Sequence, residues 1–340
     1  MNVEEKFNLI KRNTAEIVTE EELKKLLKTK KKPVVYIGTA ITGKPHIAYF
    51  IWVLKLADFL KAGFHVKLLL SDITGALDNT PWDILDKRYK YYQKAIPLMF
   101  KSLGADIKEF EIVKASDINL DKKYFFDLLK LSTFTSVHDA RKAASDVVKQ
   151  SDNPKLSGLI YPLVQTLDEE YLKVDVQYGG VDQRKILMFA RESLPKIGYK
   201  SRIELMTPMI PGLIGKKMSA SDPKSKIDLL DDEKTVIDKI KSAYCEPGIV
   251  EENGVLAFIQ HVIMVLKGDK GKPFIIERPE KFGGNLEFTN YADLEQAYRK
   301  KELHPLDLKN ALAKEINILL EPMRKASKEL EKLSAAAYKE

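Results

Sequence analysis

The chain of 340 residues has 44% hydrophobic and 31% charged residues, a formal net charge of +7 and a single cysteine, Cys245. This composition is that of a globular protein of two or three domains, and one cysteine excludes an internal disulfide framework and suits a reducing compartment. The N-terminus lacks the apolar segment of a secretory signal, and the longest apolar stretch, 255–266, is too short to span a bilayer. We therefore expect a cytoplasmic protein without a membrane partner, whose moderate positive charge permits a polyanionic partner.

Short apolar runs alternate with amphipathic stretches along the first half of the chain. Thr19 and Glu22 have the spacing of a capping box, which predicts a helix over 20–28. We predict buried strands at 33–37, 64–70, 110–115 and 174–178. We predict amphipathic helices between them at 46–62, 82–103 and 181–194. This alternation predicts an α/β fold with a doubly wound parallel sheet, whose ligand site lies beyond the carboxyl ends of the strands.

The second half of the chain has a different pattern. A mostly helical insertion, about 121–166, separates the third and fourth predicted strands. Beyond residue 231 the helical period dominates, over 232–243, 252–266, 290–300 and 305–337. We therefore predict an α/β domain over 1–225 and an α-helical C-terminal domain over 226–340.

The loop after the first strand has the layout of a phosphate-binding loop. Gly38 and Gly43-Lys44 have Walker A spacing, but Pro45 stands where that motif needs Ser or Thr to hold magnesium. Proline at the first position of a helix leaves the following N–H groups free for an anion, and His46 would lie beside it. A histidine in a first helical turn is more often incidental, so this loop by itself does not establish a site.

A second loop, 208–222, carries Lys217, Ser219 and Ser221, which together could grip a polyphosphate. Alone, such a loop is better explained as a solvated Lys/Ser segment. Paired with His46 at the carboxyl edge of the same sheet, it becomes a specific signal for a nucleotide site.

A third group of polar residues has helical spacing. Tyr161, Gln165 and Asp168 stand at i, i+4 and i+7 and so share one helix face, where polar groups cost free energy unless they hold something polar. A Gly-Gly turn after the fourth strand then places Asp182 and Gln183 at the start of the next helix. From the residues alone, the three helix residues could equally well form a buried polar network without a ligand. The Gly-Gly turn could equally well be an ordinary strand-to-helix connection.

Two of these stretches resemble signatures of a known family. "PHIAYF" (45–50) and "KKMSASD" (216–222) resemble the HIGH and KMSKS motifs of class I aminoacyl-tRNA synthetases. Longer stretches, above all 157–186, resemble the eukaryotic and archaeal type of tyrosyl-tRNA synthetase. The chain departs from the family at Ala48, Tyr49 and Ala220 within the motifs, and at 74–76, where Thr-Gly-Ala replaces the usual His-Ala-Tyr.

The resemblance implies a tyrosine–tRNA ligase with a Rossmann-like catalytic domain and a helical anticodon-binding domain. Tyr36 and Asp168 would bind the phenol of tyrosine, and Tyr161, Gln165 and Gln183 its α-ammonium group. His46, Lys217, Ser219 and Ser221 would serve catalysis. The residues implied for ATP are Gly38, Thr39, Thr42, Gly43, His46, Gly180, Asp182 and Lys217.

The same resemblance implies the partners. They are tRNA(Tyr), tyrosine, ATP with Mg²⁺, and a second copy of the chain that binds through the helical insertion; no permanent cofactor or metal site is implied. The residues implied for the tRNA are Phe282, His304 and Asp307 at the anticodon, and Arg141 and Lys142 at the acceptor stem. From the residues alone, 304–307 are equally ordinary helix-start residues.

Two alternatives stay open at this point. The tryptophanyl enzyme shares the fold, although Tyr36 with Asp168 suits a phenol better than an indole. A non-catalytic RNA-binding relative is the other alternative, and the joint presence of His46, Lys217 and the pocket residues argues against it.

Overall fold

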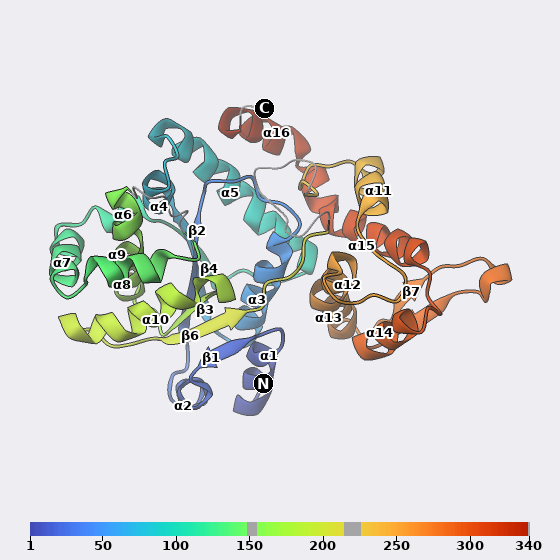
Figure 1. Ribbon diagram of the computed structural model, residues 1–340, viewed down its shortest axis with the longest axis horizontal. Helices are drawn as coiled ribbons and strands as arrows, with labels where there is room; N and C mark the ends of the chain where they lie inside the picture. Colours follow the sequence, from blue (N-terminus) through green and yellow to red (C-terminus); the bar gives the residue numbers. More distant parts are fainter. Residues whose placement is uncertain (148–154, 214–225, 339–340) are drawn as a thin grey trace.

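The structure is a computed structural model that describes residues 1–147, 155–213 and 226–338. A six-stranded sheet lies at the centre of its α/β part, in the order β1-β6-β5-β2-β3-β4 (Figure 1). All neighbouring strands are parallel except β1 and β6, which are antiparallel. The strands are β1 (Glu16–Val18), β2 (Val34–Ala40), β3 (His65–Ser71), β4 (Phe110–Lys114), β5 (Val176–Gly180) and β6 (Ile203–Thr207).

The predicted α/β fold with a parallel sheet is confirmed, and the four predicted strands are β2, β3, β4 and β5. The sequence did not predict β1 and β6. β1 has only three residues, and the second residue of β6 is a glutamate, Glu204, which breaks the apolar run that would have indicated a buried strand.

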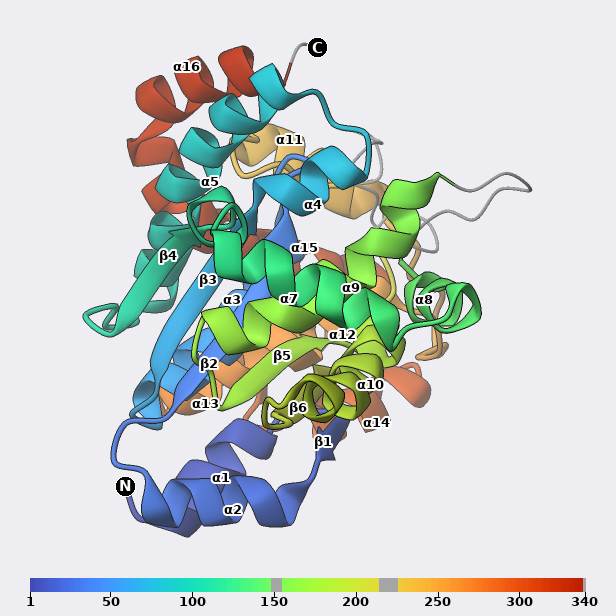
Figure 2. The same cartoon turned by 90° about the vertical axis from the view of Figure 1, so that its left-hand side faces the viewer.

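Helices cover both faces of the sheet. Figures 1 and 2 show α3 (Tyr49–Lys61) and α5 (Trp82–Leu103) on one side, and α9 (Leu156–Tyr171) and α10 (Arg184–Ser193) on the other. α5 ends where predicted because Gly104 takes a left-handed φ of 70°, which a helix cannot continue. The other helices of the α/β part are α1 (Val3–Lys11), α2 (Glu20–Thr29), α4 (Asp72–Leu77), α6 (Ser116–Asn119), α7 (Lys122–Thr133), α8 (Val137–Ala144), η1 (Val181–Gln183) and η2 (Leu194–Ile197).

The predicted capping box is confirmed at the start of α2. The Glu22 N–H donates to Thr19 Oγ1 at 3.2 Å, and the Thr19 N–H donates back to Glu22 Oε2 at 3.2 Å. Each bond satisfies a backbone donor that the helix itself leaves unpaired, which is why the helix begins here.

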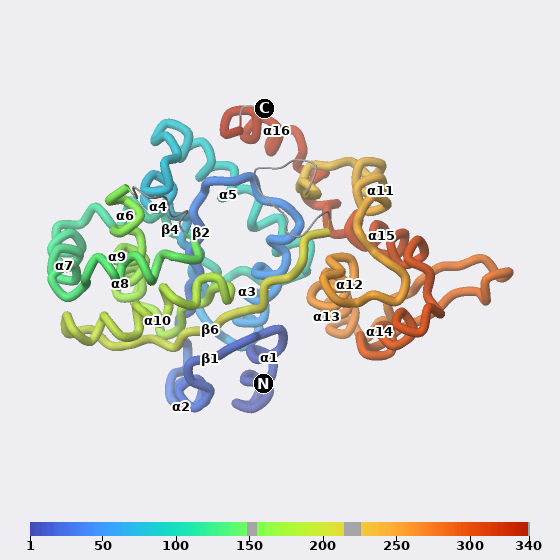
Figure 3. Tube along the Cα trace, in the orientation of Figure 1, coloured from blue at the N-terminus to red at the C-terminus, as the bar shows by residue number. Residues whose placement is uncertain are grey.

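Residues 226–338 are mostly helical but also contain a β-hairpin that the sequence pattern did not predict. Figure 3 shows this hairpin at the end of the molecule opposite α7. The predicted helix over 305–337 is in fact two helices, because the chain bends at Ala326. The elements are α11 (Glu233–Ser242), α12 (Gly254–Phe258), the π-helical η3 (Ile259–Ile263), α13 (Met264–Asp269), β7 (Phe274–Ile276), η4 (Glu280–Phe282), β8 (Leu286–Phe288), α14 (Tyr291–Arg299), α15 (Pro305–Lys325) and α16 (Ser327–Ala337).

The last helix returns to the α/β part. α16 lies beside α5, where Lys94 and Glu329 form an ion pair at 2.7 Å and Arg88 Nε donates to the carbonyl of Ala337 at 3.4 Å. None of the helices in the described residues is long and apolar enough to cross a membrane.

Candidate active site

A cavity of about 610 Å³ lies at the carboxyl ends of β2, β3 and β5, where the strand pattern predicted a ligand site. The structure brings most of the proposed site residues together in its wall. Those that line it are Tyr36, Gly38, Thr39, Thr42, His46, Tyr161, Gln165, Asp168, Gly180, Asp182 and Gln183.

Asp168 lies on α9 and is 2% exposed. Its Oδ1 accepts hydrogen bonds from Asn119 Nδ2 at 2.8 Å and from the Tyr124 hydroxyl at 2.9 Å. Burial raises the pKa of Asp168 to about 7, although both hydrogen bonds act in the opposite direction. Because both donors use Oδ1, Oδ2 is left to accept a hydrogen bond from a ligand hydroxyl.

Tyr36 lies on β2 and is fully buried. Its hydroxyl donates to the backbone carbonyl of Gln165 on α9 at 3.3 Å. Burial raises the pKa of this hydroxyl well above 10, and the nearby carboxylate of Asp168 adds to the effect. The hydroxyl is therefore a neutral donor, and it lines the same cavity as Asp168.

A row of polar side chains crosses the sheet below this pair. Tyr36 is level with Gln177 on β5, and Gln177 with Glu204 on β6, so the three side chains project from one face of the sheet. The carboxyl oxygens of Glu204 and of Glu169 on α9 have no hydrogen-bond partner among the described residues, and both residues are fully buried. Burial raises the pKa of Glu204 to about 8, and that of Glu169 well above its ordinary value.

The loop after β2 corrects one expectation. Pro45 is not the first helical residue, because α3 begins at Tyr49. The N–H of Ile47, one of those that the helix was expected to leave free, donates to the carbonyl of Ile227 at 3.1 Å. His46 and Ile47 pair with the chain at 227–228, and so the predicted helix-terminus anion site is not formed in this way.

His46 is 6% exposed, and its Nδ1 has no hydrogen-bond partner among the described residues. Burial, assisted by Lys226, lowers its pKa to about 4. The imidazole is therefore neutral at pH 7 and offers a hydrogen bond to a ligand, whereas a positive charge would have to come from other residues.

Gly43, which we expected to contact ATP, does not line the cavity. Its carbonyl accepts hydrogen bonds from the hydroxyls of Tyr92 at 2.7 Å and Tyr338 at 2.8 Å. These two bonds turn this part of the loop toward α5 and the C-terminal residues.

The turn after β5 brings the backbone close to the cavity. A Cβ on Gly180 would lie 2.4 Å from Asp182 Oδ1, so a larger residue here would displace this carboxylate from its present position. Asp182 and Gln183 follow in the 3₁₀ turn η1, ahead of α10.

Lys217, Ser219 and Ser221 lie outside the described residues. The chain that follows them returns directly to the first loop, where Lys44 and Asp228 form an ion pair at 2.9 Å. Among the described residues, no group of three or more His, Cys, Asp or Glu side chains could hold a metal ion.

The residues proposed for the anticodon lie on two turns that Arg278 connects. Its Nε donates to the carbonyl of Gly284 at 3.0 Å and its Nη1 to that of Glu302 at 3.1 Å. Phe282 is 61% exposed on the first turn. On the second turn, His304 Nδ1 accepts from the Leu306 N–H at 3.1 Å and caps α15, which is the helix-start role that the sequence left open.

Arg141 and Lys142 lie on the exposed side of α8, at the opposite end of the molecule from the β7–β8 hairpin (Figures 1 and 3). The strands β2, β3 and β5, which contribute to the cavity wall, lie between these two ends.

Sequence reasoning missed three residues at the site. Asn119 and Tyr124 orient Asp168, and Asp78 lines the cavity, as does Thr74 from the stretch where the chain departs from the family pattern. Tyr124 could have been found in the sequence as a polar side chain on the inner face of the insertion helices. Gly75, which departs from the family pattern, stands where a Cβ would lie 2.7 Å from Leu85 Cδ2, so the usual alanine would require that leucine to move.

Comparison with known proteins agrees with this geometry. Residues 28–321 match the family described as tRNA synthetases class I (W and Y). The chain is 48% identical to a cytoplasmic tyrosine–tRNA ligase of Danio rerio, covering all of the chain and 64% of that protein. It is 43% identical to a tyrosine–tRNA ligase of Haloarcula marismortui, covering all of the chain and 99% of that protein.

A solved structure is similar along almost the whole chain. The tyrosyl-tRNA synthetase of Archaeoglobus fulgidus, complexed with L-tyrosine, superposes with a TM-score of 0.88 at 39% identity and covers 95% of this chain and 99% of its own. The chain spans less than two thirds of the vertebrate relatives that it matches, 64% of the Danio rerio protein.

The chain belongs to the class I tRNA synthetases of the tryptophan and tyrosine type. Its relatives in both eukaryotes and archaea are the tyrosine enzymes, so the resemblance to the eukaryotic and archaeal tyrosyl-tRNA synthetases is confirmed.

Proposed function

We propose that this protein is a tyrosine–tRNA ligase, which activates tyrosine with ATP and transfers it to the 3′ end of tRNA(Tyr). The observation that carries the proposal is the buried pair Tyr36 and Asp168 in the wall of the cavity. A ligand hydroxyl would donate to Asp168 Oδ2 and accept from Tyr36. Phenylalanine would leave the buried Asp168 Oδ2 without a donor, which costs free energy, and an indole has no acceptor for Tyr36.

Other residues that line the cavity suit the rest of the amino acid. Tyr161 and Gln165 project from α9 and Gln183 from η1, so their oxygens would accept hydrogen bonds from the α-ammonium group. In this orientation the carboxylate of tyrosine points toward the loop after β2, where Gly38, Thr39 and Thr42 line the cavity.

Adenylate formation needs no catalytic dyad, since the tyrosine carboxylate is already an anionic nucleophile. One of its oxygens bonds to the α-phosphorus of ATP while the bond to the bridging oxygen breaks, and pyrophosphate leaves with the Mg²⁺ that came with the substrate. The protein would hold the reactants in line and stabilise charge on the phosphates. Gly180 and Asp182 would bind the ribose, and His46 would donate a hydrogen bond to a phosphate as a neutral imidazole. Positive charge would come from Lys217, in the loop that also carries Ser219 and Ser221.

Transfer would follow when a hydroxyl of the terminal tRNA ribose attacks the tyrosyl carbonyl and AMP leaves. We assign anticodon recognition to Phe282, His304 and Asp307, because an exposed aromatic ring suits stacking on an unpaired base. Arg141 and Lys142 would contact the acceptor stem. The division into a catalytic domain, 1–225, and an anticodon domain, 226–340, is part of this proposal.

An exposed apolar surface supports a homodimer. Six large apolar side chains on α7, at the start of α8 and in the adjoining turns are each at least 50% exposed, which is more than a monomer usually leaves open in one place. They are Leu120, Phe125, Phe126, Leu129, Phe134 and Val137. We propose that a second copy of the chain covers them, and that the protein acts in the cytoplasm, as the names of several relatives state for those proteins.

Tyrosine-dependent exchange of pyrophosphate into ATP tests the proposal directly. We expect exchange with tyrosine and little with phenylalanine or tryptophan. Asp168→Asn should strongly reduce kcat/KM for tyrosine and should change KM for ATP only slightly. Asp127→Asn is a matched control, because Asp127 is also buried and accepts hydrogen bonds from Tyr171 and Tyr199 away from the cavity. Exchange that depends on tryptophan, or no exchange at all, would refute the proposal.

A further inference from the structure

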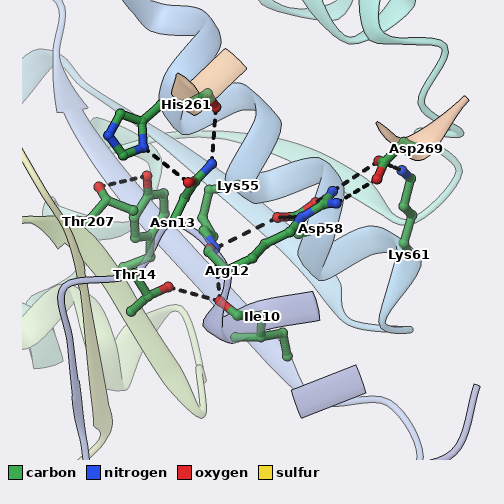
Figure 4. A network of polar contacts seen from close by, with 11 residues as sticks. Ile10, Arg12, Asn13, Thr14, Lys55, Asp58, Lys61, Thr207, His261 and Asp269 are labelled. Atoms are coloured by element: carbon green, nitrogen blue, oxygen red, sulfur yellow. Dashed lines mark hydrogen bonds and ion pairs between the residues drawn. The ribbon is translucent and has the colours of Figure 1, made fainter. Parts of the chain in front are cut away.

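A polar network joins the N-terminal segment, α3 and the C-terminal part of the chain (Figure 4). Its centre is Arg12, the residue that ends α1. The next residue, Asn13, has a left-handed φ of 53°, which asparagine tolerates better than most residues, and this turns the chain between α3 and η3.

The guanidinium of Arg12 holds two carboxylates at once. Nε donates to Asp58 Oδ2 at 2.9 Å, and Nη2 donates to Asp58 Oδ1. Nη1 donates to Asp269 Oδ1 at 2.5 Å, and Nη2 to Asp269 Oδ2 at 3.0 Å. Asp58 is on α3 of the α/β part, whereas Asp269 is the last residue of α13 in the C-terminal part.

Neighbouring contacts reinforce the same junction. Lys61 of α3 also donates to Asp269 Oδ2, at 2.5 Å. Asn13 Nδ2 donates to the carbonyl of His261 at 3.0 Å, and Asn13 Oδ1 lies 3.0 Å from His261 Nδ1. Burial alone would raise the pKa of Asp269, but the hydrogen bonds from Arg12 and Lys61 outweigh it and lower the pKa to about 2. The carboxylate is thus ionised and tightly held.

Apolar packing between α3 and η3 also connects the two parts, but it is not directional. A guanidinium that binds two carboxylates in a fork is directional, since each pair of hydrogen bonds requires one relative orientation of its partners. α3 is also the helix that follows the loop carrying His46, so its C-terminal half is tied to α13 and its first turn to the nucleotide site.

We propose that Arg12 is a positioning residue, which sets the orientation of the C-terminal part relative to α3 so that a bound tRNA delivers its 3′ end to the cavity. This inference rests on the proposed function, because it assigns tRNA recognition to the C-terminal part. Adenylate formation takes place in the cavity of the α/β part, and none of Arg12, Asp58 and Asp269 lines that cavity. Loss of the junction therefore acts on charging of tRNA and spares tyrosine activation.

Asp269→Ala is the first test, because it releases the C-terminal part while Arg12 still neutralises the buried Asp58. Arg12→Lys is the second, since it keeps a positive charge beside Asp58 but loses the fork. The matched controls are Glu295→Ala and Arg299→Lys: Arg299 Nε donates to Glu295 at 2.9 Å, but both residues belong to α14.

Three measurements are made on each variant: pyrophosphate exchange, charging of full-length tRNA(Tyr), and charging of a minihelix that contains only its acceptor stem. In Asp269→Ala and Arg12→Lys we expect exchange within about twofold of wild type and kcat/KM for full-length tRNA reduced at least about fivefold, as is typical of coupling between sites. Minihelix charging should stay at the wild-type level, and the controls should match wild type throughout. Unchanged charging of full-length tRNA, or an equal loss with the minihelix, overturns the proposal.

A substrate-free measurement separates this inference from the proposed function. Spin labels at Lys108 and Lys300, in a Cys245→Ser background, report the distance between the two parts by pulsed electron paramagnetic resonance. We expect a broader distance distribution in Asp269→Ala than in Glu295→Ala. An unchanged distribution overturns the positioning role even if wild type charges tRNA. If wild type fails to charge tyrosine, the proposed function fails and so does the role of Arg12 in charging.

Discussion

Removal of the Tyr124 hydroxyl tests how the tyrosine site is tuned. In wild type this hydroxyl donates to Asp168 Oδ1 at 2.9 Å, and burial already holds the pKa of Asp168 at about 7. Tyr124→Phe removes a donor to the ionised carboxylate while keeping the ring that packs in the insertion core. The pKa of Asp168 should therefore rise further, and tyrosine binding should need a higher pH.

The size of the effect follows from the free energy of the lost bond. A hydrogen bond to a charged group contributes about 1.5–3 kcal/mol, and about 1.4 kcal/mol corresponds to one pKa unit, so the pKa of Asp168 should rise to about 8–9. At pH 7.5 the ionised fraction then falls from roughly 75% to between roughly 25% and 3%. If the ionised form binds the phenol, kcat/KM for tyrosine drops about 3- to 25-fold at pH 7.5, and the loss disappears as pH approaches about 9.5.

The assay is tyrosine-dependent pyrophosphate exchange from pH 6 to 9.5, reported as the ratio of wild type to variant so that titration of the substrate cancels. Tyr171→Phe is the control, because that ring packs 4.7 Å from Tyr124 and its hydroxyl donates to Asp127 at 2.7 Å, outside the cavity. A ratio for Tyr124→Phe that is the same at every pH would show that the hydroxyl does not act through ionisation of Asp168.

Four further changes probe other parts of the molecule. His46→Ala should slow single-turnover adenylate formation with little change in tyrosine affinity. In wild type the rate should show no titration of His46 between pH 6 and 8, since the pKa of this residue is about 4. A wild-type rate that follows a group with a pKa near 6.5 would contradict the neutral imidazole. Phe282→Ala should leave pyrophosphate exchange near wild type and weaken kcat/KM for tRNA by ~1–3 kcal/mol; an equal loss in exchange would indicate a structural role. Glu204→Gln should gain stability relative to wild type as pH rises from about 4.5 to 8. Over this range the folded wild type keeps the Glu204 carboxyl protonated, because its pKa is raised to about 8, whereas the unfolded chain releases the proton. The difference in urea midpoint between variant and wild type, measured at pH 5 and at pH 8, tests this prediction. An equal difference at both pH values would argue against the raised pKa of Glu204. Phe126→Asp should shift the protein from dimer to monomer in sedimentation, and an unaffected dimer would place the interface elsewhere.

Local patterns in the sequence were sufficient for much of the scaffold. Alternating apolar runs identified β2, β3, β4 and β5, and the i, i+4, i+7 spacing of Tyr161, Gln165 and Asp168 placed them on one helix, where all three line the cavity. These features follow from backbone periodicity, which depends only on neighbouring residues. Motif resemblance added the family, because its two signatures and its central segment are short stretches that need no fold to be recognised.

Tertiary structure decided what surrounds these residues. Asp168 obtains its donors from Asn119 and Tyr124, 49 and 44 positions away, and Arg12 meets Asp269 at a separation of 257. The same is true of His46, where pairing with 227–228 delays the start of α3 and burial makes the imidazole neutral. Hydrogen-bond partners and pKa values depend on which groups folding brings within a few ångströms and on how much water it excludes, and neither quantity is a property of a local stretch of sequence.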